Sequence, residues 1–255
     1  MSPNLQTLYK KYKLGDVQKQ ESELPTIVNV HGGPHSCYLA FYMPTLVLYA
    51  RLGIKSLLIN YRGSTGVSEN YLRRLCGKIG SIDVGDCLHV IRHLAKNRAI
   101  DPKKLVIHGG SHGGFLACHL SCQDEFKFTS AIIRNPVVDL VSMYSTSDIP
   151  DWINSAALGH DEFDFTWLPT KEELAKLYDS SPISRVSKAY VPTLMFIGNK
   201  DKRVRMFQGE RWIDHLAARG VETKCKVYAD KHALSKTEVS ADSVITAIIW
   251  MLRHL

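Results

Sequence analysis

Short apolar runs alternate with longer amphipathic segments along most of this chain. Most of the runs are rich in Val, Ile and Leu, and six of them predict β-strands at residues 26–30, 55–60, 104–108, 129–134, 192–198 and 223–228. The segments between them repeat apolar residues every three or four positions, which predicts helices near residues 41–51, 82–96, 171–178, 206–219 and 241–254. In residues 82–96, Val84, Cys87, Leu88 and Ile91 would share one face.

This alternation is typical of an α/β protein whose mostly parallel sheet is covered by helices on both faces. A chain of 255 residues, 45% of them hydrophobic, can form one such unit. We therefore expect a single domain over residues 1–255, with an irregular N-terminal extension at residues 1–24. The stretch 136–189 is the expected wall of a substrate pocket. Its Trp152 and Trp167 could line that pocket or simply pack, and packing is favoured more for Trp167.

The most informative motif is Gly109-Gly110-Ser111-His112-Gly113-Gly114, which directly follows the apolar strand at 104–108. A strand that runs into G-x-S-x-G and then into a helix predicts a nucleophile elbow, a strained turn that exposes the serine hydroxyl. The positions two before and two after Ser111 must be small, because the turn packs them against each other. Glycine meets this need and also tolerates unusual backbone angles. The pattern alone is weak, and its context makes it strong.

A second loop supports this interpretation. His31-Gly32-Gly33-Pro34 follows the strand at 26–30, and a His-Gly-Gly loop in that place can supply a backbone N–H to a developing oxyanion. We predict Gly33 as one donor and the amide of His112, at the start of a helix, as the other. Taken alone, the loop would be an ordinary tight turn.

Two further residues complete a candidate triad. Asp201 follows the strand at 192–198, and His232 lies in the loop after the strand at 223–228. The carboxyl ends of strands are where catalytic side chains gather in open α/β sheets. The chain order Ser111, Asp201, His232 is that of the α/β-hydrolase triad, so we predict an α/β-hydrolase fold. A solvated loop aspartate is the alternative for Asp201. Of the other histidines, His108, His119, His215 and His254 are expected to be structural or exposed.

With these motifs in place, the chain resembles the catalytic domain of the acylaminoacyl-peptidases, within the prolyl oligopeptidase family of serine peptidases. The resemblance covers roughly residues 25–255. The matching stretches are 31–36, 60–66, 110–115, 134–137, 147–152, 181–183, 201–204 and 232–235. The Ser-Asp-Ile-Pro-Asp-Trp run at 147–152 points to this eukaryotic-type branch in particular.

The resemblance implies a hydrolase that releases an N-acylated, typically N-acetylated, amino acid from short acylated peptides through an acyl-enzyme. It also implies that Arg203, in the Asp-x-Arg-Val motif, binds a substrate carbonyl; a salt bridge to a nearby carboxylate is the alternative. Family members carry a β-propeller before this domain, and we expect none in this chain. A general carboxylesterase of the same fold, or a catalytically silent truncated chain acting as an oligomer partner, remain alternatives.

Composition adds a few exclusions. The sequence contains no H-E-x-x-H, phosphate loop or dinucleotide-binding glycine pattern, so we expect neither metal nor cofactor; His89 and His93 stand four apart without a third ligand. The net charge of +7 is spread along the chain, which argues against nucleic acid and fits a basic surface left where an interacting domain or subunit is absent. We expect a homo-oligomer. The last apolar stretch, at 244–252, is too short for a membrane span. The six scattered cysteines suggest a reducing, cytoplasmic location.

Overall fold

The computed structural model describes residues 23–255; most of the predicted extension at 1–24 lies outside this range. Six strands form one sheet in the order β2-β1-β3-β4-β5-β6, and every neighbouring pair is parallel. The strands are β1 Thr26–Val30, β2 Lys55–Ile59, β3 Leu105–Gly110, β4 Ser130–Arg134, β5 Thr193–Gly198 and β6 Thr223–Tyr228. The predicted α/β-hydrolase class with a mostly parallel sheet is confirmed.

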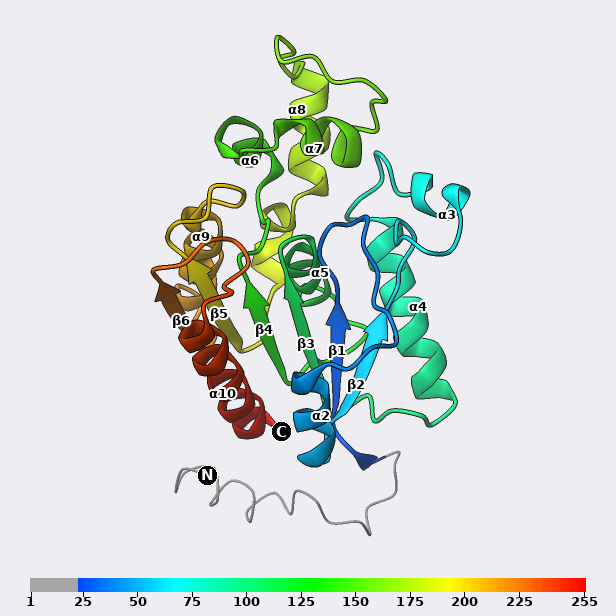
Figure 1. Ribbon diagram of the computed structural model, residues 1–255, viewed down its shortest axis with the longest axis vertical. Coiled ribbons are helices and arrows are strands. Elements are labelled where there is room, and N and C mark those ends of the chain that lie inside the picture. The colour runs from blue at the N-terminus through cyan, green and yellow to red at the C-terminus, as the bar shows by residue number, and fades with distance from the viewer. Residues whose placement is uncertain (1–22) are drawn as a thin grey trace.

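Helices cover both faces of this sheet (Figure 1). Helices α2 (Pro44–Arg51) and α10 (Thr237–His254) lie on one face. Helices α4 (Ile82–Lys96), α5 (His112–Leu120) and α9 (Met206–Ala217) lie on the other. The short helix α3 (Glu69–Arg73) precedes α4.

The apolar strands divide their side chains between two cores. In β1, Ile27 packs with α2 and α10, whereas Val28 packs with the core around α4, α5 and α9. Neighbouring residues of β4 divide in the same way, with Ile132 on the α2/α10 side and Ile133 opposite. Strand side chains alternate between faces, so a strand that is buried on both sides must be apolar throughout.

Between β4 and β5 the chain builds a cap over the carboxyl edge of the sheet (Figure 1). This cap consists of α6 (Leu140–Thr146), α7 (Pro150–Trp152), a π-helix (Ile153–Leu158) and α8 (Lys171–Ser180), and a 3₁₀-helix (Pro182–Lys188) then leads towards β5. Trp167 packs edge-on against Tyr144, whose hydroxyl donates to the Trp167 carbonyl at 2.7 Å. Trp167 therefore packs, as favoured from the sequence.

Two helices begin at other residues than the pattern predicts. Helix α2 begins at Pro44 rather than near residue 41, since proline suits the first helical position and Phe41 and Tyr42 remain exposed before it. Helix α10 begins four residues earlier than predicted, at Thr237. Val239 extends its buried stripe, but the polar Ser243 one turn later hides that continuity in the sequence.

The strand order fixes where a site can form. Strand β1 lies next to β3, and the connection after β1 runs through α2 on one face of the sheet while that after β3 runs through α5 on the other. The loops that follow β1 and β3 therefore diverge from adjacent strand ends and leave a crevice between them. Such switch points are where open α/β sheets bind ligands.

Candidate active site

Ser111 joins β3 to α5 in a strained conformation, with φ 58° and ψ −123°. Positive φ is uncommon for a residue with a side chain, and it clusters at functional sites. Ser111 stands at the N-cap of α5, where serine ordinarily accepts a bond from the helix backbone. Its side chain makes no such bond, so the hydroxyl is left for other partners. This geometry is that of a nucleophile elbow.

The glycines beside Ser111 are required by close packing. A Cβ on Gly109 would lie 2.1 Å from the carbonyl oxygen of Gly113, and a Cβ on Gly113 would lie 2.2 Å from that of Val30. Both distances are far inside van der Waals contact, and the clashing atoms belong to backbone. The turn thus forms only with glycine at both positions, as the sequence pattern predicts.

The structure brings Asp201 and His232 together from two strand ends. His232 Nδ1 donates to Asp201 Oδ2 at 2.5 Å, and the Asp201 side chain is fully buried. The other oxygen of Asp201 accepts the amides of Arg203 at 2.8 Å and Val204 at 3.0 Å, which fixes the carboxylate. Because Nδ1 is held by the carboxylate, Nε2 of His232 is the nitrogen free to exchange protons.

A cavity of about 290 Å³ beneath the cap joins most of the predicted site. Ser111, His232, Gly33 and Arg203 all border it, and its apolar wall comes from the residues after β4 and from the cap, namely Val137, Met143, Ile149 and Trp152. Arg203 also pairs with Asp148, with 3.3 Å between Nε and Oδ1. This pair is about half exposed and so contributes little to stability. Arg203 thus makes the salt bridge given as the alternative to substrate binding, and it also borders the cavity.

The loop after β1 lies against the nucleophile. A Cβ on Gly32 would lie 3.0 Å from the Gly110 carbonyl oxygen and 3.3 Å from the Cβ of Ser111, so a side chain there would crowd the turn. Gly33 has φ +123°, a conformation that side chains disfavour, and its carbonyl accepts Trp152 Nε1 at 2.8 Å. The amide of His112 belongs to the first turn of α5 and has no intrahelical acceptor. The loop that carries Gly33 and the first turn of α5 that carries the His112 amide therefore both lie beside Ser111.

The His31 side chain and backbone also hold this loop in place. Its Nε2 contacts Ser64 Oγ at 2.7 Å, its ring stacks on Tyr61, and the Tyr61 hydroxyl donates to the His31 carbonyl at 2.7 Å. Burial lowers the pKa of His31 below its ordinary value, and the nearby His112 lowers it further. The imidazole is therefore neutral at physiological pH, and its role is to hold the loop through packing and hydrogen bonds.

The sequence interpretation missed Asp83. This residue starts α4 and contacts His112 Nε2 through its Oδ2 at 3.0 Å, and both side chains are fully buried. The pair anchors the residue whose amide we predict to be an oxyanion donor. A signal was present, because Asp83 precedes Cys87 and Ile91 by four and eight positions and so shares the apolar stripe of its helix.

Asn135 was part of a recognised motif but had no assigned role. It directly follows β4 with φ 38°, and its Nδ2 donates to the His232 carbonyl at 2.8 Å. Its Oδ1 accepts the amide of Gly198, also at 2.8 Å. One side chain thus connects the ends of β4 and β5 with the loop that carries His232.

The remaining histidines lie elsewhere, with one exception. His119 is buried in α5, His215 is exposed on α9, and His254 bonds to the carbonyl of Trp250. His108, expected to be structural or exposed, borders a second cavity that Ser111 also lines. Among residues 23–255, no three His, Cys, Asp or Glu side chains are grouped so that they could hold a metal ion, and no helix is long and apolar enough to cross a bilayer.

This arrangement agrees with comparisons to known proteins. The sequence profile of the Prolyl oligopeptidase family matches residues 40–255. This chain belongs to the prolyl oligopeptidase family. It is 39% identical to the acylamino-acid-releasing enzyme of Arabidopsis thaliana over 231 residues, which is 90% of this chain and 30% of that protein. It is 34% identical to the human enzyme of that name, covering 92% of this chain and 32% of the relative. The predicted resemblance is confirmed.

Solved structures share the fold. A Pyrococcus horikoshii acylaminoacyl peptidase superposes with a TM-score of 0.80 at 23% identity, covering 93% of this chain and 38% of the other. A Mycobacterium tuberculosis puromycin-hydrolyzing peptidase gives 0.83 at 24% identity, covering 91% and 34%. The chain therefore spans about a third of the length of its relatives.

Proposed function

We propose that this chain is a serine peptidase that releases an N-acylated amino acid from the N-terminus of short acylated peptides. The observation that carries the proposal is one arrangement: a strained, uncapped Ser111 borders the same cavity as His232, which Asp201 holds by Nδ1. The acylated substrate is suggested by the acylamino-acid-releasing enzymes that the chain resembles over 90% of its length.

In the first half of the reaction, Ser111 Oγ attacks the carbonyl of the acylated first residue, and His232 Nε2 accepts the hydroxyl proton. Asp201 keeps the imidazole in the correct tautomer and stabilises its charged form. The tetrahedral intermediate then collapses as His232 returns the proton to the leaving amine. The shortened peptide departs, and the acyl group remains on Ser111 as an ester.

Charge develops on the carbonyl oxygen during this step. The amides of Gly33 and His112 would donate to it, and a donor of this kind contributes about a hundredfold to a thousandfold in kcat. Trp152 Nε1 and the Asp83–His112 pair hold the two donors in place. Arg203 would donate to a carbonyl of the acyl portion in the cavity under the cap.

In the second half, His232 takes a proton from water, and the resulting hydroxide attacks the ester. The ester bond breaks, Ser111 regains its proton from His232, and the N-acylated amino acid is released.

The decisive experiment compares substrates. Hydrolysis of acetyl-alanyl peptide amides should exceed that of simple butyrate esters, with acetyl-alanine as the released product. A preference for the butyrate esters would instead identify a general carboxylesterase. A fluorophosphonate probe should label Ser111, and a chain that resists labelling would be a silent oligomer partner.

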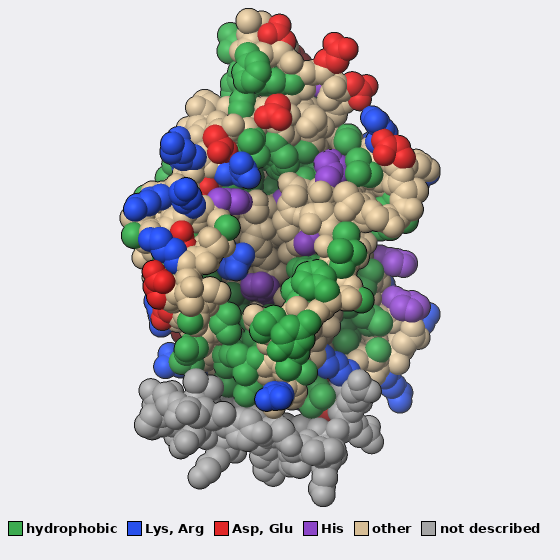
Figure 2. Space-filling model, viewed as in Figure 1, with side chains coloured by type: hydrophobic (Ala, Val, Ile, Leu, Met, Phe, Trp, Pro, Cys, Tyr) green, Lys and Arg blue, Asp and Glu red, His purple; other side chains and the backbone are tan. Residues whose placement is uncertain are grey.

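We further propose self-association, because large apolar side chains gather on one surface. Figure 2 shows hydrophobic side chains over the lower front of the molecule, where α2 lies. Leu39, Phe41 and Tyr42, in the loop before α2, are 61%, 62% and 75% exposed.

A cytoplasmic location also stays a prediction; it is supported by the six cysteines, all of which are free.

A further inference from the structure

A second cavity adjoins Ser111 on the α2/α10 side of the sheet. Its volume is about 450 Å³, and Ser111 and His232 border it as well as the cavity under the cap. The nucleophile therefore stands between two spaces. The mechanism above uses only the space under the cap, which contains Gly33 and Arg203.

The floor of the second cavity is polar where the sheet is otherwise apolar. On this face, Ile27, Val106 and Ile132 belong to the α2/α10 core. Two residues further along the same strands come Asn29, His108 and Arg134, which line the cavity. Side chains two apart in a strand share a face, so these three polar groups replace the core at the carboxyl end of β1, β3 and β4. Thr45 and Ser240 add hydroxyls from the covering helices.

Two of these polar residues satisfy each other. Asn29 Nδ2 donates to the carbonyl of Ile27, so its Oδ1 faces His108 and accepts from His108 Nδ1 at 2.9 Å. Burial, together with the charge of Arg134, lowers the pKa of His108 to about 3. His108 is therefore neutral, and its Nε2 is left as an acceptor.

Arg134 is different, because no side chain neutralises it. Within residues 23–255 its guanidinium makes no salt bridge and no hydrogen bond. Tyr38 and Tyr49 also interact with it, and both phenols are uncharged because burial raises their pKa values, that of Tyr49 to about 12. Burial lowers the pKa of Arg134 itself, yet arginine stays charged in proteins. Arg134 is half-buried, and a cation that faces a cavity without a neutralising side chain favours the binding of an anion there.

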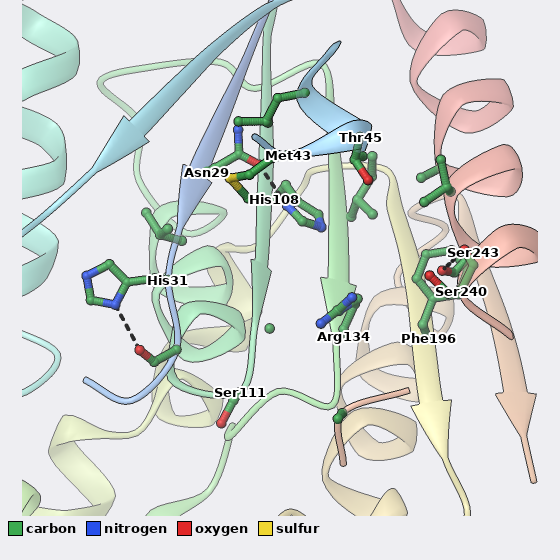
Figure 3. A pocket seen from close by; sticks show the side chains of 18 of the residues that line it. Asn29, His31, Met43, Thr45, His108, Ser111, Arg134, Phe196, Ser240 and Ser243 are labelled. Atoms are coloured by element: carbon green, nitrogen blue, oxygen red, sulfur yellow. Dashed lines mark hydrogen bonds between the residues drawn. The ribbon is translucent and has the colours of Figure 1, made fainter. Parts of the chain in front are cut away.

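The Arg134 side chain also lies beside the turn that carries the nucleophile. A Cβ on Gly110 would lie 3.4 Å from Arg134 Nε, which is ordinary van der Waals contact, so the side chain is directly adjacent to the residue before Ser111. The carbonyl of Arg134 accepts the amide of Ser111 at 2.9 Å, which places the two residues side by side. Figure 3 shows Arg134 projecting from β4 into the cavity that Ser111 and His108 also line.

We propose that this cavity receives the leaving peptide and that Arg134 binds its C-terminal carboxylate, which makes short free-acid peptides the preferred substrates. The inference rests on the proposed function and extends it to the other side of the scissile bond. A planar guanidinium can donate two parallel bonds to a carboxylate. Each peptide residue spans about 3.5 Å, so the proposal places the carboxylate one or two residues beyond the scissile bond. The neutral His108 Nε2 can accept an N–H of the same segment.

The test compares acetyl-alanyl-alanine as its free acid and as its C-terminal amide. For the wild-type chain we expect kcat/KM to be about tenfold or more higher for the acid, as befits a hydrogen bond to a charged group. Arg134→Gln should bring this acid-to-amide ratio to about 1 while leaving hydrolysis of the amide within about twofold. Arg203→Gln is the matched control, and it should slow both substrates equally because Arg203 acts on the acyl side.

Three results would overturn the proposal. The first is a wild-type acid-to-amide ratio near 1, and the second is an equal loss of kcat/KM on both substrates in Arg134→Gln. The third is a kcat/KM for acetyl-alanyl-aspartate amide, which carries its carboxylate on a side chain, as high as that for the free acid. Arg134→Lys retains the charge and should keep a reduced preference. It replaces Arg134→Gln if the latter does not melt cooperatively.

A binding measurement separates this proposal from the proposed function, since it needs no catalysis. Saturation-transfer NMR should detect alanyl-alanine on the wild-type chain, with a weaker signal for its amide and for Arg134→Gln. If acetylated peptides are not cleaved but this pattern is seen, the proposed function fails and the carboxylate site stands. If the peptides are cleaved and the acid binds no better than the amide, only the carboxylate site fails.

Discussion

Ser111, Asp201 and His232 are brought together by separate strand ends and should act as one unit. Ser111→Ala removes the attacking oxygen and a small side chain only, so the fold should remain while kcat falls on the order of 10⁶-fold. His232→Ala should cost about as much, and the double variant should be little worse than either. The kcat of each of the three variants is measured by hydrolysis of acetyl-alanyl peptides. Turnover above a few per cent of wild type in Ser111→Ala would contradict the assignment.

A different histidine should make stability depend on pH. His119 is fully buried, its Nε2 bonds to the Ser180 carbonyl, and its Nδ1 has no partner within residues 23–255. Burial lowers its pKa to about 4, below the ordinary 6.5. Between pH 6.5 and about pH 4, His119 is therefore protonated in the unfolded chain and neutral in the folded chain. Stability is complete above about pH 6.5 and is lost as the pH falls towards 4, by at most about 3 kcal/mol from this residue.

Denaturant unfolding at pH 5 and pH 7.5 measures this loss. His119→Gln keeps an amide donor and cannot titrate, so the difference in unfolding free energy between the two pH values should shrink. His215→Gln is the matched control, since His215 is exposed on α9 and should leave the difference unchanged. An unchanged difference in His119→Gln would show that other groups cause the acid sensitivity.

The site residues could be predicted to the extent that each lies in a local pattern. Ser111 and Gly33 occur in short motifs at strand ends, and Asp201 and His232 follow predictable strands. The position of Arg134 in a cavity, without a partner for its charge, could not be predicted. It depends on how β4 packs with α2 and α10. Asp83 meets His112 across a separation of 29 residues, which no spacing rule reveals.

At the scale of elements, the end of β4 is held to the end of β5 and to the loop that bears His232. Asn135→Ala removes both side-chain bonds, so we expect kcat to fall about tenfold to a hundredfold because the imidazole loses its exact place. KM should change little, since Asn135 does not border the cavity under the cap. Steady-state kinetics with an acetylated dipeptide measures kcat and KM separately.

The control lies at the other end of the same strand. Thr129 Oγ1 donates to the Leu105 carbonyl at 3.2 Å, so Thr129→Val removes a comparable bond far from the site. It should lower the melting temperature slightly and leave kcat unchanged. Equal losses of kcat in both variants would mean that Asn135 acts through overall stability and does not position the His232 loop.

Elements were predictable where hydrophobic periodicity was strong and long. All six strands and the helices α4 and α9 follow from it within a few residues. Helix α3 and the π-helix at Ile153–Leu158 were not predicted, because each is too short to show a period. The cap is held by tertiary contacts such as that between Tyr144 and Trp167, which the local sequence does not encode.

At the scale of the whole molecule, the exposed apolar loop before α2 should drive self-association. Phe41→Ser combined with Tyr42→Ser removes its two most exposed side chains, and sedimentation velocity over a range of concentrations should show a smaller average species than for wild type. Phe165→Ser is the control, because Phe165 is 88% exposed on the cap, away from this loop. A wild-type chain that stays monomeric at every concentration, or an effect as large from Phe165→Ser, would refute an association surface at residues 39–42.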